Sequence, residues 1–270
     1  MNVIEQFYDA DPQHEWERLG QRHRTEFALT MRALTEHVPA APARVLDIGG
    51  SVGRYSIVLT QQGYHVTLFD LSQACLNFAV ERALEAGITL DTLIHGNAVD
   101  LSALSDASFD VVLLMGPLYH LVQSADRDKA ICEAMRVLKP GGILAAAFIT
   151  RYAPIRSVAK LSPAWIVNDS ATLNSIMETG VLYMPPGRNF THAYLAHPSE
   201  VRPLFERHGL QTLDLIACEG VISLIEEQVN ETQGELWDAW VQLNYRLCRD
   251  QWAQATAEHL LYIGQKPLAK

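Results

Sequence analysis

The residues with the clearest chemical meaning lie in a glycine-rich segment and in an acidic residue that follows it. Residues 45–48 (VLDI) form an apolar run that leads directly into residues 49–53 (GGSVG). A tight turn of this kind between a strand and a helix lets the backbone approach a nucleotide-like ligand and directs N–H groups at it. Asp70 ends the next apolar run, 23 residues after Asp47. A carboxylate there can accept hydrogen bonds from both hydroxyls of a ribose.

Two kinds of ligand compete for this geometry. The dinucleotide fingerprint is Gly-x-Gly-x-x-Gly, and counting from Gly49 puts Ser51 and Arg54 at its second and third glycine positions. The pattern Asp-x-Gly-x-Gly-x-Gly fits better, and its positions hold Asp47, Gly49, Ser51 and Gly53. Only the middle glycine is replaced, by a residue nearly as small. A ligand without a pyrophosphate is therefore favoured.

These residues need a scaffold, and the hydrophobic pattern predicts alternating strands and helices. Strands are predicted over residues 44–48, 65–70, 90–95, 109–115 and 143–149, with helices over 53–62, 72–86 and up to 138 between them, and a charged helix over 13–37. Ser72 is the candidate N-cap of one helix and Ser124 or Asp126 of another, while residues 139–142 (KPGG) predict a turn. Such alternation produces a parallel sheet with right-handed crossovers.

Five segments carry a resemblance to a known family. VLDIGGSVGRYS, VTLFDLS, GNAVDLS, FDVVLLMGPLYHL and RVLKPGG occur in this order within residues 44–149. Together they resemble the class I S-adenosylmethionine-dependent methyltransferase family. The resemblance implies an α/β, doubly wound, seven-stranded sheet of order 3-2-1-4-5-7-6, with the last strand antiparallel. It also implies S-adenosylmethionine as the cofactor.

The resemblance further implies which residues hold the methionine and ribose parts of the cofactor. Asp47 lies where an acid holds the methionine ammonium group, often through water. Gly49, Ser51 and Gly53 lie at the positions that line the methionine and ribose in the family. Asp70 lies where the ribose hydroxyls are bound.

The adenine and the far end of the methionine are assigned in the same way. Leu71 lies at the position that packs on the face of the adenine in the family. Asn97 and Ala98 lie at the positions that contact its edge. The family more often has Asp at position 97, but the Asn carbonyl can also accept from the exocyclic amine. Met115 and Gly116 end the fourth strand, where a backbone carbonyl meets the methionine ammonium group.

Candidates for catalysis follow the fourth and fifth strands. Methyl transfer from a sulfonium is an in-line displacement, so the protein must align a nucleophile and exclude water. A general base is needed only where the nucleophile carries a proton. Tyr119 and His120 follow the fourth strand, and His120 is either a base or an orienting group. Arg151 and Tyr152 follow the fifth strand, with Arg156 one helical turn later, where a guanidinium would suit a carboxylate.

The remaining segments are expected to cover the sheet edge within one domain of residues 1–270. Residues 1–43 are expected to form N-terminal lid helices, and their Tyr8 and Trp16 to fold over the cofactor held by the core at 44–149. Residues 150–198 and 221–255 are expected to be helical insertions that form the substrate lid. Weaker lid candidates are Tyr183, Asn189, His192 and Tyr194. The tryptophans between 237 and 252 are expected to face either a core or another subunit, with the core favoured.

Composition narrows the choice of partner. The formal net charge is −10, whereas nucleic-acid binding usually needs a basic face. Arg18, Arg22, His23 and Arg24 are interpreted as a solvated helix face. The longest apolar run, residues 143–149, is too short to cross a bilayer. We therefore expect a small-molecule substrate, no nucleic acid, no membrane, and a monomer or homodimer.

The cysteines and the N-terminus indicate the compartment. Cys75, Cys132, Cys218 and Cys248 are far apart, with no Cys-x-x-Cys pair and no His at metal spacing. We therefore expect reduced, mostly buried thiols and no metal. The N-terminus is acidic and lacks the apolar core of a signal peptide, so a cytoplasmic location is expected.

Three functions remain open at this stage. The first is methyl transfer to a small metabolite at nitrogen, oxygen or carbon. In the second, a cyclase of the same fold, the cofactor's own amine attacks its γ-carbon and gives azetidine-2-carboxylate and methylthioadenosine. The third is a non-catalytic cofactor-binding module. Products formed from S-adenosylmethionine with and without an acceptor distinguish the three.

Overall fold

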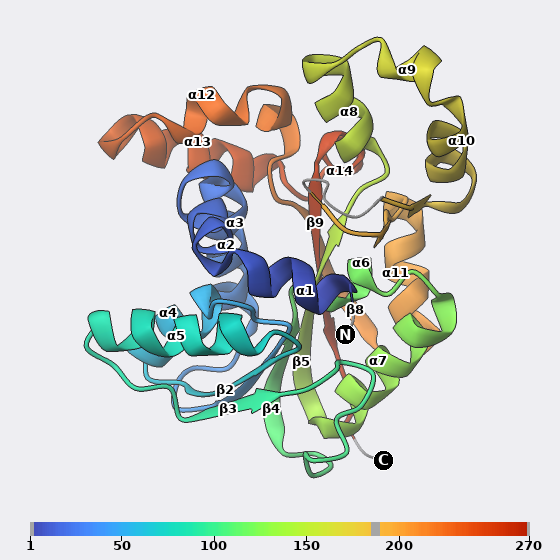
Figure 1. Ribbon diagram of the computed structural model, residues 1–270. Coiled ribbons are helices and arrows are strands. Elements are labelled where there is room, and N and C mark those ends of the chain that lie inside the picture. The colour runs from blue at the N-terminus through green and yellow to red at the C-terminus, as the bar shows by residue number, and fades with distance from the viewer. Residues whose placement is uncertain (1–2, 185–189, 269–270) are drawn as a thin grey trace.

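A seven-stranded sheet runs through the computed structural model, which describes residues 3–184 and 190–268 (Figure 1). Its strand order is β3-β2-β1-β4-β5-β9-β8. The strands are β1 (Arg44–Ile48), β2 (His65–Asp70), β3 (Thr92–His95), β4 (Phe109–Leu114), β5 (Leu138–Ile149), β8 (Gln211–Ala217) and β9 (His259–Gln265). The last of them, β9, is antiparallel to both β5 and β8. The predicted topology is therefore confirmed.

Helices cover both faces of this sheet because its central strands are apolar on both sides. In β4, Val112 and Leu114 face one core and Val111 and Leu113 face the other. The first core packs against α7 (Ser124–Val137) and α11 (Pro198–Glu206), and the second against α3 (Arg24–His37) and α4 (Arg54–Gln61). Beside α4 lies α5 (Gln73–Glu85), which Ser72 caps as predicted by accepting from the Cys75 N–H (3.0 Å). Because successive apolar side chains of a strand point to opposite faces, the sheet packs between two layers of helices.

The N-terminal segment differs from the single helix predicted over residues 13–37. It consists of α1 (Val3–Ala10), α2 (Pro12–Glu17), a π-helical turn η1 (Arg18–Arg22), and then α3. Gly20 lies in the π-helical turn, where a Cβ atom would come within 2.1 Å of the Arg54 guanidinium. The wider turn and the missing side chain leave room for that guanidinium. Residue spacing along a helix contains no signal for such an insertion.

Two smaller sequence predictions are also corrected. Residues 139–142, expected to form a turn, belong to β5: the register passes from Phe109↔Leu138 to Val111↔Ile143 across a bulge. The bulge stays in the sheet because the Gly141 N–H donates to the Lys266 carbonyl (2.8 Å). At α7, neither Ser124 nor Asp126 is the N-cap. That position is Gln123, whose side chain makes no capping hydrogen bond.

Two insertions lie beyond the ends of β5 and β9, on the upper side of Figure 1. The first holds α8 (Tyr152–Leu161), α9 (Trp165–Asn168), α10 (Ser170–Thr179) and a small sheet of β6 (Val181–Leu182) and β7 (Ala193–Tyr194). The second holds the 3-10 helix η2 (Gly220–Ile225), α12 (Glu226–Asn230), α13 (Gly234–Leu247) and α14 (Gln251–Thr256). A further short helix, α6 (Pro117–His120), follows β4. The predicted helical insertions are confirmed.

The side chains of the second insertion are more exposed than expected. Trp252 is 72% exposed, and Trp237 and Trp240 are half-buried rather than in a core. The Arg24 guanidinium lies 3.6 Å over the Trp237 ring, so a cation–π contact takes the place of core packing. All four cysteines are free, and Cys132 is the exposed one. Within residues 3–184 and 190–268, the helices are all too short or too polar to cross a membrane.

Candidate cofactor-binding and active site

A pocket of about 900 Å³, counting the part open to solvent, lies across the carboxyl ends of β1, β2, β3 and β4. Ligands of open α/β sheets bind in this crevice, at the carboxyl ends of the strands. Eleven of the residues predicted from sequence line it: Tyr8, Gly49, Ser51, Asp70, Leu71, Asn97, Ala98, Met115, Gly116, Tyr119 and His120. The pocket therefore joins the glycine-rich turn, three further strand ends and the N-terminal segment.

Asp70 is held at the pocket wall by two backbone groups. The Ser51 N–H donates to Asp70 Oδ2 and the Ser72 N–H to Asp70 Oδ1, each at 2.7 Å. Each carboxylate oxygen keeps a lone pair for a ligand hydroxyl. Burial raises the pKa of Asp70 to about 6, although the two N–H donors favour its charged form. The carboxylate is therefore oriented before a ligand arrives.

The turn that supplies the Ser51 N–H contains residues with positive φ, a backbone conformation that favours glycine. Gly49 has φ +69°, and a Cβ atom on it would lie 2.5 Å from the Pro117 ring. Ser51, in the position where the family has glycine, also has positive φ (+49°). Gly53 has φ +75° and begins α4, and a Cβ there would lie 3.0 Å from the Ala79 Cβ. Gly53 does not line the pocket, so its role is to let α4 approach α5.

Asp47 lies under the turn rather than at the pocket surface. It is completely buried; Ser56 Oγ donates to its Oδ2 (2.7 Å), and its Oδ1 has no hydrogen-bond partner. Burial raises the pKa of Asp47 to about 6. A buried carboxylate oxygen without a donor is costly. It fits a ligand ammonium group, reached through a water molecule, as the missing partner.

The side of the pocket at the ends of β2 and β3 contains the residues expected around an adenine. Leu71, Asn97 and Ala98 line the pocket together with Gly96, and a Cβ on Gly96 would lie 2.5 Å from the Phe69 ring. The Asn97 side-chain oxygen already accepts from the Val99 N–H (3.2 Å). It retains one lone pair, so it can accept one hydrogen bond from a ligand amine.

A chain of hydrogen bonds closes the pocket at the end of β4. The Tyr8 hydroxyl lies 2.7 Å from His120 Nε2, and Thr191 Oγ1 lies 2.9 Å from His120 Nδ1. Thr191 donates its own proton to the His192 carbonyl (3.0 Å). It therefore accepts from His120 Nδ1–H, which leaves Nε2 to accept from Tyr8. Burial lowers the pKa of His120 to about 4, so the ring is neutral at neutral pH.

The N-terminal helix α1 is fastened across the pocket by polar contacts. Besides the bond between Tyr8 and His120, Asp9 Oδ1 accepts from the Ser72 hydroxyl (2.6 Å) and the Ala74 N–H (3.3 Å). No residue of α1 is fully buried. Figure 1 shows α1 lying across the front of the sheet beside α6. A helix held in this way can open without disturbing a core.

Three other predicted residues lie outside the pocket. Trp16 packs against the hydrophobic side of α4 and α5, with the Arg54 guanidinium 3.6 Å over its ring. Arg151 donates to the carbonyls of Met177 and Leu195 and to Glu200, so its guanidinium ties the first insertion together. Tyr152 makes an edge contact with His197. The structure thus places all three side chains away from the pocket, whose lining they were expected to join.

The weaker lid candidates also serve the insertion itself. The Tyr194 hydroxyl donates to Glu200 (2.8 Å), and His192 accepts from the Met184 N–H (2.9 Å). Tyr183 packs edge-on against His192. Asn189 lies outside the described residues. The first insertion instead contacts the pocket residue His120 through Thr191, for which the sequence contains no motif.

Arg18 is the main lining residue that the sequence analysis placed elsewhere. It was expected on a solvated helix face, but its Nε donates to Glu15 (2.9 Å) and its Nη1 to Glu26 (3.3 Å). Arg18, Glu15 and Tyr55 all line the pocket. The π-helical turn begins at Arg18, so the gathering of basic residues that suggested a solvated face did not reveal where this side chain lies.

The sheet order and the crevice at its carboxyl edge define a doubly wound nucleoside-binding enzyme fold. Residues 46–146 match the model of the methyltransferase domain family. The ubiquinone biosynthesis O-methyltransferase of Xylella fastidiosa (strain 9a5c) is 36% identical over 185 residues, which cover 67% of this chain and 66% of that protein. This chain thus spans slightly less than two thirds of that relative.

Two further similarities extend over more of the chain. The tRNA 5-carboxymethoxyuridine methyltransferase of Escherichia coli (strain K12) is 23% identical over 88% of this chain and 85% of that protein. The crystal structure of an S-adenosylmethionine-dependent methyltransferase from Methanosarcina mazei has a TM-score of 0.61 at 20% identity, covering 88% of this chain and 98% of that one. The ubiquinone biosynthesis O-methyltransferase of Xanthomonas euvesicatoria pv. vesicatoria (strain 85-10) is 30% identical, with 54% of this chain and 68% of that protein covered. The chain therefore belongs to the class I S-adenosylmethionine-dependent methyltransferase family, whose cofactor is S-adenosylmethionine.

Proposed function

We propose that this chain transfers the methyl group of S-adenosylmethionine to a hydroxyl group of a small molecule. The observation that carries the proposal is the neutral His120, whose Nε2 accepts a hydrogen bond at the pocket end opposite Asp70. An acceptor hydroxyl that replaces the Tyr8 hydroxyl would meet the same lone pair. The name of the Xylella relative, an O-methyltransferase, supports oxygen as the methylated atom.

The cofactor end of the pocket has a binding role. When bound, S-adenosylmethionine supplies an electrophilic methyl carbon on a positively charged sulfur. Asp70 accepts from the ribose hydroxyls through the two lone pairs that Ser51 and Ser72 leave free. Asp47 contributes negative charge beneath the turn, and its free Oδ1 attracts the ammonium group. These residues bind and orient the cofactor and take no proton during the reaction.

His120 has the role of moving a proton. Its Nδ1–H is held by Thr191, so its Nε2 remains the acceptor. With a pKa of about 4 it is a weak base, and it does not ionise a hydroxyl in advance. The acceptor oxygen becomes strongly acidic as the new C–O bond forms, and a weak base within hydrogen-bond reach is then sufficient. Burial also excludes water from this end of the pocket.

The charge around the pocket favours a small substrate over RNA. Among the lining residues that the structure describes, Arg18 is the only Lys or Arg, and Glu15 and Glu26 pair with it. The whole chain carries a net charge of −10. A polyphosphate substrate needs unpaired cations beside its backbone. The tRNA enzyme of Escherichia coli is therefore the weaker guide to the substrate.

Product analysis tests the proposal. The protein is incubated with S-adenosylmethionine, with and without a panel of catechols and other phenols, and the products are identified by mass spectrometry. Methyl transfer predicts adenosylhomocysteine only when an acceptor is present, in equal amount to a methylated phenol. Methylthioadenosine formed without an acceptor would show the cyclase reaction instead. Tight cofactor binding with neither product would show a binding module.

A further inference from the structure

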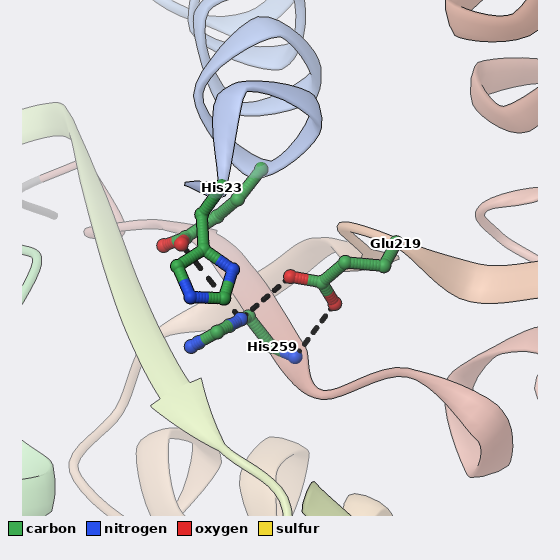
Figure 2. A group of neighbouring side chains, drawn as sticks. His23, Glu219 and His259 are labelled. Carbon is green, nitrogen blue, oxygen red and sulfur yellow. Dashed lines mark hydrogen bonds and ion pairs between the residues drawn. The ribbon is translucent and has the colours of Figure 1, made fainter. Parts of the chain in front are cut away.

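Four side chains outside the cofactor pocket come together from both ends of the chain. His23 and Glu26 lie at the beginning of α3, Glu219 follows β8, and His259 is the first residue of β9. One nitrogen or oxygen atom from each lies within 4.8 Å of the other three. Figure 2 shows His23, Glu219 and His259 turned toward one another. We propose that this group binds a divalent transition-metal ion of the zinc or manganese kind.

The strand pairing explains how two of these ligands meet. Cys218 N–H donates to the His259 carbonyl (3.0 Å), so the end of β8 and the beginning of β9 are held side by side. Glu219 Oε2 accepts from the backbone N–H groups of Glu258 (3.1 Å) and His259 (2.8 Å). The remaining oxygen, Oε1, lies 2.5 Å from His259 Nδ1. A ligand carboxylate oriented by its own hydrogen bonds is typical of metal sites.

The donor set suits a transition metal. Two imidazoles and two carboxylates are hard-to-intermediate ligands, which Zn²⁺ and related ions accept at about 2.0–2.2 Å. Ligand atoms on one such ion lie roughly 3–4 Å apart. The observed separations, from 2.5 Å up to 4.8 Å, bracket this range. His23 also contacts Glu226 through Nδ1 (3.3 Å), which can orient the ring as an outer partner.

The charge of the surroundings favours a cation. Three of the four candidate ligands are buried, with His23 half-buried. Five carboxylates belong to this neighbourhood of the described chain: Glu15, Glu26, Glu219, Glu226 and Glu258. Two guanidinium groups accompany them, those of Arg18 and Arg156.

Glu219 and Glu226 have histidines rather than arginines as their partners. Burying carboxylates without full compensation of their charge is costly. The His23 and His259 rings lie 5.2 Å apart beside these carboxylates, and a single divalent ion bound between the four side chains would offset the negative charge.

The site is independent of the proposed reaction but is linked to the pocket. Glu26 is one candidate ligand, and its Oε2 accepts from Arg18, a residue of the pocket wall. An ion bound here would fasten the beginning of α3 to β9. The sequence offered no sign of this set, because its members are spread over 236 residues and only His23 and Glu26 are at helical spacing.

Metal binding is measured on the full chain after chelator treatment and dialysis. Zn²⁺ and Mn²⁺ are added separately, uptake is followed by calorimetry and elemental analysis, and Co²⁺ reports coordination through its visible absorption. We expect about one ion per chain, and at least a 10-fold loss of affinity in Glu219→Gln. The control is His65→Gln, which removes an exposed histidine that pairs with Asp91 at 3.0 Å and should bind the ion normally.

Two further measurements keep the result decisive. Because Glu219 is fully buried, Glu219→Gln can fail to fold, so the half-buried His23→Gln is tested in parallel and should also lose the cobalt spectrum. Folding of each variant is checked by circular dichroism. The proposal is overturned if the folded wild-type protein takes up no stoichiometric ion. It is equally overturned if His23→Gln binds as tightly as His65→Gln, since the four residues would then be an ion-pair cluster only.

Discussion

The two ends of the pocket are built in different ways. At the cofactor end, Asp70 is held by the Ser51 and Ser72 backbone N–H groups, both from within twenty residues of it in the chain. At the other end, the chain of hydrogen bonds joins Tyr8, His120 and Thr191, three side chains from distant segments. The first arrangement is a property of local turns, and the second exists only when remote segments pack together. Changes at the first end should therefore affect cofactor binding, and changes at the second should affect catalysis.

The largest effect should come from Gly49→Ala at the cofactor end. Position 49 has a positive φ, which a residue with a Cβ disfavours, and the added Cβ would lie 2.5 Å from the Pro117 ring. We therefore expect the free energy of unfolding to fall by about 2–4 kcal/mol. Chemical denaturation measures it. Gly87→Ala is the matched control, because Gly87 has φ +73° but open space around its Cβ position. Gly87→Ala should lower the free energy of unfolding by only about 1 kcal/mol. Equal losses would show that contact with Pro117 does not matter.

Next in size is His120→Ala at the opposite end. We expect kcat to fall about 100-fold, because the proton acceptor is lost, while the Kd of the cofactor changes by less than about 3-fold. Single-turnover kinetics and calorimetry give the two quantities. Thr191→Val keeps the imidazole and removes its Nδ1 partner, so it should lower kcat by a smaller factor. A parallel fall in cofactor affinity would remove the distinction between the two ends.

Asp70→Ala tests the cofactor end in the complementary way. Loss of two charge-assisted hydrogen bonds should weaken binding of S-adenosylmethionine by about 1–3 kcal/mol, measured by calorimetry. The exposed Asp91→Ala is the control and should bind normally. Unchanged affinity in Asp70→Ala would contradict the ribose assignment.

The pH dependence of binding should reveal the same carboxylate. Burial raises the pKa values of Asp70 and Asp47 to about 6, so affinity for adenosylhomocysteine should fall as the pH drops below about 6, by up to roughly 10-fold per unit for each group. Asp70→Asn should remove one of the two contributions. The stability of the ligand-free protein should respond in the opposite sense. Both groups bind protons in the folded state above their unfolded pKa of about 3.9, so their contribution to stability rises as the pH falls from about 7 to 4. Identical pH profiles for the wild type and Asp70→Asn would exclude Asp70.

The smallest effect is expected from Tyr8→Phe. Removing the hydroxyl deletes the 2.7 Å bond to His120, while Asp9 still holds α1 on Ser72. Hydrogen exchange in α1 should become faster, because the free energy that holds α1 in place falls by about 0.5–1.5 kcal/mol, while the Kd of the cofactor changes by less than about 3-fold. Tyr64→Phe removes a tyrosine hydroxyl bonded to the Pro39 carbonyl elsewhere (2.9 Å) and should change neither quantity. Unaltered exchange in Tyr8→Phe would mean that this bond does not fasten α1.

What could be predicted from the sequence follows the same division. The strands and the glycine-rich turn were accessible because apolar runs and glycine positions are local signals, whereas the strand order was implied by the resemblance to the methyltransferase family. The position of Arg18 was predicted wrongly because a π-helical turn changes the direction in which its side chain points. The burial of Trp252 was predicted wrongly because an apolar residue type alone does not determine whether a side chain is covered. Thr191 could not be found, since its contact with His120 spans 71 residues. Arg151 was identified as a candidate, but its role could not be predicted, because its carbonyl partners are set by the fold of the insertion.

The position of β9 has a consequence for how the molecule assembles. It is the final strand in sequence, yet it lies between β5 and β8, and β8 pairs with no other strand of the described sheet. During synthesis, β8 is made some forty residues before β9, so until then it has no strand with which to form backbone hydrogen bonds. The first five strands can pair while the chain is still growing, whereas closure of this edge is a late step. A nascent chain halted before residue 259 would expose two unpaired edges, and chaperones would be expected to recognise them.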